Sequence, residues 1–410
     1  MFGRKRPTVL IAGAGPAGLL GALCLAEHGI VAEIVDASPA DEAVRRRRLR
    51  GAVTLLYPRT LELLDRYGIA GSLLARAQRV RRLGVYSDGE RVGALSFEQL
   101  SNTQGLRFPF AAVVAVADLE RCAADILRQR HIDVGYERRL ARIEQGTARV
   151  RATVDHLGSD SAGYATAHGE LIVERSEELD LDFVLAADGH QSLVRQQLNV
   201  TWRELGSAER YDVVDGSVRD RLPEEAALLF ADGANGVLWP LPGGRWRFIA
   251  GPDSGARARL AIRARWLAPE GHELEGHGHI DVGYSLASPW GIGRVWLVGG
   301  AAHATSPLGA QSLNVGLWEA ERLGHLLAAV LRGAEPVGAL AIYERERSDE
   351  WARLLPLRTP RTPGVGGHPA AGAAGGYRGL DLDRLTPCVP ASGADLDALL
   401  EQVRSASAVP

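Results

Sequence analysis

Six residues near the start of the chain form a glycine-rich motif that could bind phosphate: Gly13-Ala14-Gly15-Pro16-Ala17-Gly18. It follows a short apolar run, residues 8–12, and precedes a helix expected over 16–28. In such a setting the first glycine permits a tight turn, the second lets the backbone approach a pyrophosphate, and the third lets helix and strand pack closely. The start of the helix adds free N–H groups and the positive end of its dipole. We therefore expect a dinucleotide pyrophosphate to bind at Gly13, Gly15, Pro16, Ala17 and Gly18.

An acidic residue completes this motif. Residues 31–35 are a second apolar run, so that strand, helix and strand form a βαβ unit of about 30 residues. Asp36 comes directly after it, where a carboxylate can hold a ribose hydroxyl. The sequence has no second glycine fingerprint preceded by a strand, so we expect one dinucleotide to be held firmly and any second one to visit.

A second strand–turn–helix pattern lies in the middle of the chain. Residues 183–187 are an apolar run that ends in Asp188-Gly189, and Ser192 stands near the start of the next helix. By itself this pattern is also typical of an ordinary Asp-Gly turn followed by a capped helix.

A third such pattern lies further on. Residues 294–299 predict a buried strand that leads through Gly300 into a loop, and a helix is expected over 315–332. The start of that helix could stabilise negative charge, such as that of an anionic reduced flavin. Judged alone, the segment is equally a structural connection with Asn314 as N-cap.

Composition sets limits on the class of protein. The 410 residues are 46% apolar and 24% charged, which is typical of a globular chain and excludes a disordered or coiled-coil one. The net charge of −3 gives no basic field for nucleic acid. The three cysteines, Cys24, Cys122 and Cys388, are odd in number and widely spaced, so they predict neither disulfides nor a zinc site. We expect a cytoplasmic protein without membrane spans or metal, either monomer or homodimer.

The remaining elements follow from periodicity. Apolar residues at helical spacing predict a helix over 118–130. Short strands are expected over 134–185 and 209–250. Segment 359–377, rich in Gly, Ala and Pro, predicts a flexible linker, and a last helix near 394–404 would cover the core or pair with another subunit.

In this order and at these separations, the three motifs resemble those of flavoprotein aromatic hydroxylases of the p-hydroxybenzoate hydroxylase type, which include bacterial polyketide hydroxylases. The resemblance covers about residues 7–355. It implies an α/β fold, in which a Rossmann-like, three-layer FAD-binding domain is interleaved with a smaller mixed β-sheet domain over the substrate. It also implies reduction of FAD by NAD(P)H and transfer of one oxygen from a flavin C4a-hydroperoxide to an aromatic or polyketide substrate.

The resemblance assigns site residues and domain boundaries. Asp188 and Gly189 would serve FAD and NAD(P)H, and the loop against the flavin ring would contain Gly300, Pro307, Gly309, Gln311 and Asn314. The FAD-binding domain would comprise 1–75, 105–195 and 285–355, the substrate domain 76–104 and 196–284, and the linker with the C-terminal helix 356–410. No catalytic acid or base is assigned.

Four positions depart from the family pattern. Gly300 replaces an aspartate that hydrogen-bonds the ribityl chain, Val116 replaces a glutamine, and Ala310 and Ser312 replace glycines. A left-handed backbone at either of the last two would cost about 1–2 kcal/mol. All four lie at the ribityl and ring half of the site, so FAD binding could be weakened or lost.

These departures leave two alternatives to the monooxygenase. One is an enzyme on the same scaffold without redox function, which catalyses a cyclisation, dehydration or rearrangement. The other is a non-catalytic binding protein.

Two sets of side chains could be functional, but a structural role is the favoured interpretation for each. His272, His277 and His279 lie among glycines and favour a solvated loop over a metal site. Three of the eight tryptophans could line a pocket, but core packing is the favoured interpretation for them, and they are Trp239, Trp246 and Trp290.

Overall fold

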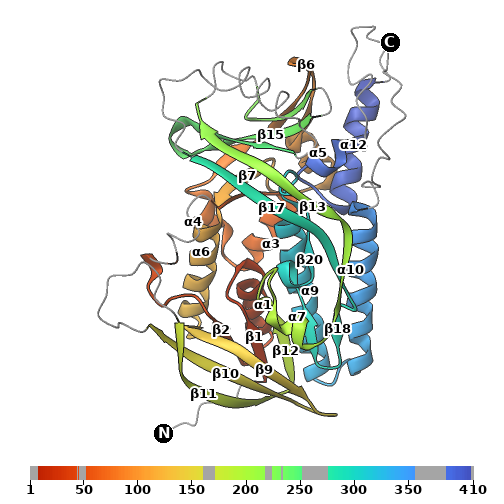
Figure 1. Ribbon diagram of the computed structural model, residues 1–410. Helices are drawn as coiled ribbons and strands as arrows, with labels where there is room; N and C mark the ends of the chain where they lie inside the picture. Colours follow the sequence, from red (N-terminus) through yellow and green to blue (C-terminus); the bar gives the residue numbers. More distant parts are fainter. Residues whose placement is uncertain are drawn as a thin grey trace.

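A computed structural model of the chain describes residues 8–43, 45, 52–159, 171–217, 224–231, 234–251, 276–355 and 385–407. Two large sheets dominate these residues, and helices lie between and beside them (Figure 1). Among the described helices, none is long and apolar enough to cross a bilayer.

The first large sheet has six strands and contains the three apolar runs expected from the sequence. In spatial order these are β18 (Gly291–Ile292), β19 (Val295–Leu297), β12 (Phe183–Ala186), β1 (Val9–Ala12), β2 (Ala32–Asp36) and β8 (Val134–Tyr136). Strands β19, β12, β1, β2 and β8 run parallel, whereas β18 pairs antiparallel to β19. Every residue of β1 and β12 is buried, which explains why both read as continuous apolar runs. The carboxyl ends of the three central strands therefore meet at one edge of the sheet.

Long helices cover this sheet. They are α1 (Pro16–Glu27), α6 (Val116–Gln129), α9 (Gln311–Leu331) and α10 (Leu340–Leu354). Helix α1 packs against both α6 and α9, and α10 runs beside α9 (Figure 1). The predicted helices over 16–28 and 118–130 are confirmed, but the third begins at Gln311 and not at 315.

The second large sheet has eight strands and is mixed. Its spatial order is β20 (His303–Ala304), β17 (Gly276–Ser288), β13 (Thr201–Gly216), β16 (Arg245–Ala250), β15 (Ala234–Leu241), β14 (Ala226–Ala231), β5 (Arg82–Ser87) and β6 (Glu90–Ser96). Only β14 and β5 pair in parallel among the described strands of this sheet. Most of it comes from the two ranges expected for the substrate domain, 76–104 and 196–284. The division of the chain into domains stays a prediction.

Smaller elements complete the fold. One three-stranded sheet contains β11 (Leu171–Leu181), β10 (Val150–Ser159) and β9 (Arg138–Gln145), and another contains β3 (Val53–Leu56), β7 (Ala111–Ala115) and β4 (Gln78–Val80). The shorter helices are α3 (Pro58–Arg66), α4 (Ala70–Leu74), α5 (Phe97–Gln104) and α7 (Leu193–Gln197). Single 3-10 turns lie at Pro242–Gly244, Gly299–Ala301, Val337–Ala339 and Thr386–Cys388.

The histidines of the glycine-rich segment and the tryptophans can be compared with their predicted surroundings. The backbone of His277 and His279 lies in β17 and not in a loop, because β17 pairs along β13 through both residues. Nδ1 of His279 lies 3.0 Å from Oδ1 of Asp212, and His272 lies outside the described residues. Trp239 and Trp290 are buried in the core, as expected, whereas Trp246 is half-buried.

The C-terminal segment covers the core of its own chain, which was one of the two predicted alternatives. It comprises the 3-10 turn at Thr386–Cys388 and α12 (Gly393–Ser407). Leu385 and Leu399 are fully buried, and the amide of Gln402 exchanges two hydrogen bonds with the backbone of Ser96. The linker expected over 359–377 lies outside the described residues.

Candidate dinucleotide site

The glycines of the first motif have different structural roles. Gly13 follows β1 with φ +102°, and a Cβ there would lie 2.3 Å from the carbonyl oxygen of Ala187. A Cβ on Gly18 would lie 2.0 Å from the carbonyl oxygen of Gly13. Nothing lies within 4 Å of the corresponding position on Gly15. Gly13 and Gly18 are therefore required by packing, whereas Gly15 leaves open space at the start of α1, where a pyrophosphate would approach.

Asp36 ties the end of β2 to this turn. Its Oδ2 accepts a hydrogen bond from the N–H of Ala14 at 2.7 Å, and its Oδ1 accepts one from Ser38 at 2.7 Å. An ionised carboxylate has about four acceptor positions, so two remain for ribose hydroxyls. The role of Asp36 in binding ribose stays a prediction that this geometry suits.

A cavity of about 140 Å³ lies beside the end of β2. Tyr136, one of its walls, is the direct partner of Asp36 in the sheet. The guanidinium of Arg45 stacks 3.6 Å from the centre of the Tyr136 ring. Burial, with the nearby charge of Asp36, raises the pKa of Glu120 to about 7. The position of this cavity, beside the end of β2, suits the adenosine half of a dinucleotide whose pyrophosphate would lie at Gly15.

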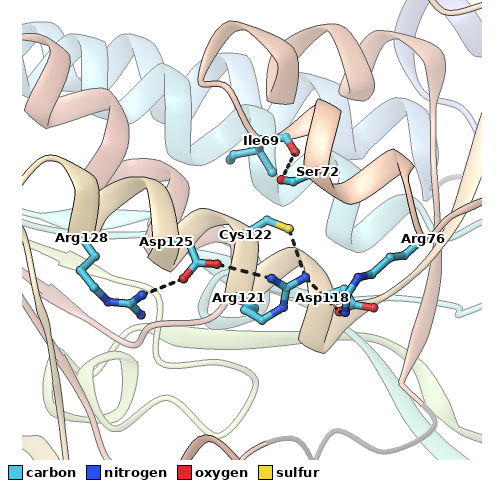
Figure 2. Close-up of polar contacts among 8 residues, drawn as sticks. All are labelled: Ile69, Ser72, Arg76, Asp118, Arg121, Cys122, Asp125 and Arg128. Atoms are coloured by element: carbon cyan, nitrogen blue, oxygen red, sulfur yellow. Dashed lines mark hydrogen bonds and ion pairs between the residues drawn. The ribbon is translucent and has the colours of Figure 1, made fainter.

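One wall of this cavity is the outer face of α6, where charges of both signs alternate (Figure 2). Arg121 lies between Asp118 and Asp125, with contacts of 3.4 Å to each. Arg128 contacts Asp125 at 2.8 Å. Because these arginines already have carboxylate partners, the wall offers no free cationic cluster, and it suits an uncharged base and sugar better than a further phosphate.

The Asp-Gly turn contains a buried oxygen that needs a partner. Oδ2 of Asp188 accepts a hydrogen bond from the N–H of Val194 at 3.1 Å, but Oδ1 is buried without a partner among the described residues. Burial raises the pKa of this carboxyl above its ordinary value. Buried polar atoms are nearly always hydrogen-bonded. A ligand hydroxyl could donate a hydrogen bond to Oδ1 of Asp188. The Asp-Gly turn therefore fits a cofactor that contains a sugar or sugar alcohol.

Arg195, to which the sequence motif assigned no role, joins the second and third motifs. It is buried and stacks on Trp202, and its two terminal nitrogens donate to the carbonyls of Ala301 at 2.9 Å and His190 at 2.7 Å. A Cβ on Gly300 would consequently lie only 3.3 Å from the backbone nitrogen of His190. The available signal in the sequence was an arginine in the short helix that follows the Asp-Gly turn.

The prediction that Asn314 caps a helix is wrong. Asn314 is fully buried inside the first turn of α9, and the N-cap position is Ala310. The side-chain Nδ2 of Asn314 donates to the carbonyls of Leu55 and Ala310, and its Oδ1 accepts from the N–H of Tyr57. Asn314 thus fixes the loop to the end of β3, because its amide can donate and accept at once.

The rest of this loop contacts the C-terminal segment. The hydroxyl of Tyr57 donates to the carbonyl of Gly309 at 2.8 Å. Nε2 of Gln311 faces three carbonyls of the C-terminal segment at 3.1–3.4 Å, those of Thr386, Val389 and Ala391. The side-chain amide nitrogen of Gln311 therefore donates within the protein. Only the backbone of Gln311 would be free to contact a cofactor.

The departures from the family pattern differ in their structural effect. Ala310 has φ +50°, in the left-handed region, so the expected strain applies there. Ser312 lies in α9 and carries no such strain. Val116 begins α6, and its N–H donates to the carbonyl of Ala52.

A buried chain of hydrogen bonds leads inward from Ser312, and sequence reasoning missed it. Oγ of Ser312 lies 3.1 Å from Nδ1 of His303, whose Nε2 lies 2.9 Å from Oε2 of Glu319. Glu319 also accepts from the N–H of Gly299 at 2.8 Å and from Nε1 of Trp351 at 2.9 Å. Burial would raise the pKa of Glu319, but the charge and hydrogen bonds of His303 and the bond from Trp351 hold it below its ordinary value. A glutamate within a helix face that is otherwise apolar was the available signal.

The open space at Gly15, the carboxylate of Asp36 and the unpaired oxygen of Asp188 lie near the carboxyl ends of the parallel strands, and they are features expected of a dinucleotide-binding α/β protein. The sequence profile of the family described as FAD binding domain matches residues 6–356. The chain belongs to this family, of the p-hydroxybenzoate hydroxylase type, and its cofactor is FAD.

Curated relatives resemble the chain over most of its length. Protoasukamycin 4-monooxygenase of Streptomyces nodosus subsp. asukaensis is 28% identical over 411 residues, which cover 95% of each chain. 6-Methylpretetramide 4-monooxygenase of Streptomyces rimosus is 27% identical over 85% of this chain. The chain spans 60% of the length of that second relative.

Solved structures share the fold. The p-nitrophenol 4-monooxygenase of Pseudomonas putida superposes with a TM-score of 0.71 at 21% identity, covering 98% of this chain and 97% of that one. Aklavinone-11 hydroxylase, solved with FAD and aklavinone, gives a TM-score of 0.65 at 25% identity and covers 87% of this chain and 68% of that one.

The different roles of the glycines give a first prediction. Gly15→Ala should leave the free energy of unfolding within about 0.5 kcal/mol of wild type, because its backbone (φ −70°, ψ 177°) suits alanine and its Cβ meets nothing. The same methyl group fills the approach to the pyrophosphate, so FAD affinity should fall at least tenfold, about 1.4 kcal/mol. Titration calorimetry with FAD and chemical denaturation measure the two quantities.

Gly13→Ala is the matched contrast. It should lower the free energy of unfolding by about 2 kcal/mol or more, because the new methyl group meets the carbonyl of Ala187 at a left-handed backbone. Wild-type FAD affinity in Gly15→Ala would contradict the placement of the pyrophosphate.

The strain at Ala310 gives a second prediction. Ala310→Gly should raise the free energy of unfolding by about 1 kcal/mol, because glycine adopts φ +50° without a steric penalty. Ser312→Gly should lower it, since Ser312 lies in a helix and bonds to His303. Changes of the same sign in both variants, measured by urea denaturation, would disprove this assignment of backbone conformation.

Proposed function

We propose that the protein is an FAD-dependent monooxygenase that uses NAD(P)H and adds one oxygen atom to an aromatic or polyketide substrate. The observation that carries the proposal is a cofactor site with open space at Gly15 and an unpaired buried oxygen on Asp188, in a chain of the FAD-binding family. Relatives named for monooxygenation of protoasukamycin and 6-methylpretetramide support the substrate class.

The residues divide the work of holding FAD. The start of α1 and Gly15 would bind the pyrophosphate, Asp36 the adenosine ribose, and Oδ1 of Asp188 a further cofactor hydroxyl. When bound, FAD supplies acceptance of a hydride from NAD(P)H and activation of O₂. The backbone at the start of α9 would face the ring end, where its free N–H groups favour negative charge.

The chain from Ser312 to Glu319 gives the ring end a place to hold a proton. His303 lies between the hydroxyl of Ser312 and the carboxylate of Glu319, so its ring can carry a proton at Nε2 while Nδ1 faces the serine. Trp351 packs on the His303 ring, with centroids 4.3 Å apart, and this stacking fixes the ring orientation.

The non-oxidative alternative is not favoured. The departures that motivated it, at Gly300, Val116, Ala310 and Ser312, leave the adenosine end of the site intact. Relatives of the chain are named as monooxygenases, and no feature of the described site points to cyclisation, dehydration or rearrangement. Three further points stay predictions. They are the transient binding of NAD(P)H, a monomeric or homodimeric state, and a cytoplasmic location.

Flavin content and turnover test the proposal directly. After incubation with FAD and desalting, the protein should keep about one flavin per chain, visible as flavin absorption. Aromatic compounds should then stimulate NAD(P)H oxidation, and mass spectrometry should find a product with one added oxygen atom. A protein that loses its flavin on desalting and oxidises no NAD(P)H would refute the proposal.

Gly300→Asp tests the weakened contact with the ribityl chain. The added carboxylate should tighten FAD binding by about tenfold, which corresponds to one hydrogen bond of 0.5–1.5 kcal/mol. Gly300→Ala is the control, because its Cβ makes the same close contact with the backbone of His190 but adds no acceptor. Equal FAD affinity in the two variants would contradict this account of Gly300.

A further inference from the structure

Two packed helices bring together side chains that bind metals, at the end of α1 opposite the glycine motif. Helix α1 carries Cys24 and is followed by His28 as its C-cap, and α9 carries Glu321 and His325. In each pair the residues are four apart, so they share a helix face. A Cβ on Gly324 would lie 2.8 Å from Sγ of Cys24, which shows that this glycine gives the thiol room against α9.

The candidate ligand atoms are close together. Sγ of Cys24 and one ring nitrogen from each of His28 and His325 all lie within 4.8 Å of one another. Nε2 of His28 and Nδ1 of His325 are 2.7 Å apart and therefore share one proton. Cys24 is fully buried, His28 is half-buried and His325 is exposed, so the cluster opens to solvent on its histidine side.

We infer that Cys24, His28 and His325 form a binding site for a divalent cation of the zinc type. A thiolate and two imidazoles are ligands that zinc prefers, at about 2.3 Å and 2.0–2.1 Å. The cation replaces the proton shared by the two rings, and tetrahedral geometry needs the two nitrogens about 3.4 Å apart. The exposed ring of His325 can move by this amount. Three protein ligands leave a fourth position for water.

The surroundings of the cluster supply negative charge. Oε1 of Glu321 lies 3.8 Å from Nε2 of His325, and it also contacts Arg66 at 3.0 Å and the hydroxyl of Tyr67 at 3.2 Å. Hydrogen bonds with Cys24 and Glu321 raise the pKa of His325 to about 10. Burial lowers the pKa of His28, as do the charges of His325 and Arg332.

The site is independent of the proposed oxygenase activity. Spacing along the chain predicts no metal site at these cysteines, because the ligands come from helices distant in sequence. A bound cation would join α1 to α9, two helices that already pack against each other. Its binding can be measured without FAD and without substrate.

The experiment uses the full chain, treated with a chelator and then dialysed against Zn²⁺ or Co²⁺. Elemental analysis should find about one zinc per chain, and cobalt should give the thiolate-to-cobalt charge-transfer absorption of a sulfur ligand. Cys24→Ser should remove that absorption, and His325→Ala should weaken zinc binding at least tenfold. Zinc should also raise the melting temperature of wild type but not that of the variants.

Control variants separate this cluster from other ligands. Cys122→Ser changes a buried thiol on α6, and His131→Asn changes an exposed histidine at a left-handed position that asparagine accepts. A double variant, His277→Ala with His279→Ala, removes histidines of the glycine-rich segment. All three should bind zinc like wild type. Circular dichroism checks folding, and His325→Ala decides the matter if Cys24→Ser does not fold. No zinc after dialysis, or unchanged zinc binding in His325→Ala, would overturn the inference.

Discussion

A single buried carboxylate, that of Glu319, connects the elements that we propose to face the flavin ring. It accepts hydrogen bonds from the turn after β19, from His303 on β20 and from Trp351 on α10, while itself belonging to α9. A fully buried charge is tolerated only when its hydrogen-bonding capacity is met. The positions of these four elements are thereby coupled, since moving any one of them would leave the charge without a partner. Two of the departures lie beside this network, because Gly300 follows Gly299 and Ser312 contacts His303.

The strands of the parallel sheet could be predicted because each has a simple cause. Residues 9–12 and 183–186 are buried on both faces, and burial on both faces requires an unbroken apolar run. The glycine motif could also be predicted, because few sequences can form a turn that lets a pyrophosphate approach the backbone. The structure agrees with the roles that the motif assigned, since a Cβ on Gly13 or Gly18 would meet the backbone whereas a Cβ on Gly15 would meet nothing.

The ring end was harder to predict because its contacts are made by side chains distant in sequence. Asn314 looks like a helix cap when only its neighbours are considered, yet its partners lie on β3. Glu319 looks like one polar residue on a helix, and its partners come from three other elements. The grouping of Cys24 with His325 likewise depends on the packing of α1 against α9. Local periodicity carries no information about such pairs.

The contact between Gln311 and the C-terminal segment bears on the order in which the protein is made. The carbonyls that receive the Gln311 amide belong to Thr386, Val389 and Ala391, which leave the ribosome long after the loop itself. Domains tend to fold as the chain emerges, so the glycine motif at Gly13–Gly18 can form earlier in synthesis. The side chain of Gln311 cannot make its final hydrogen bonds until residues 386–391 have been made. Nascent chains would therefore acquire the adenosine end of the site before the ring end.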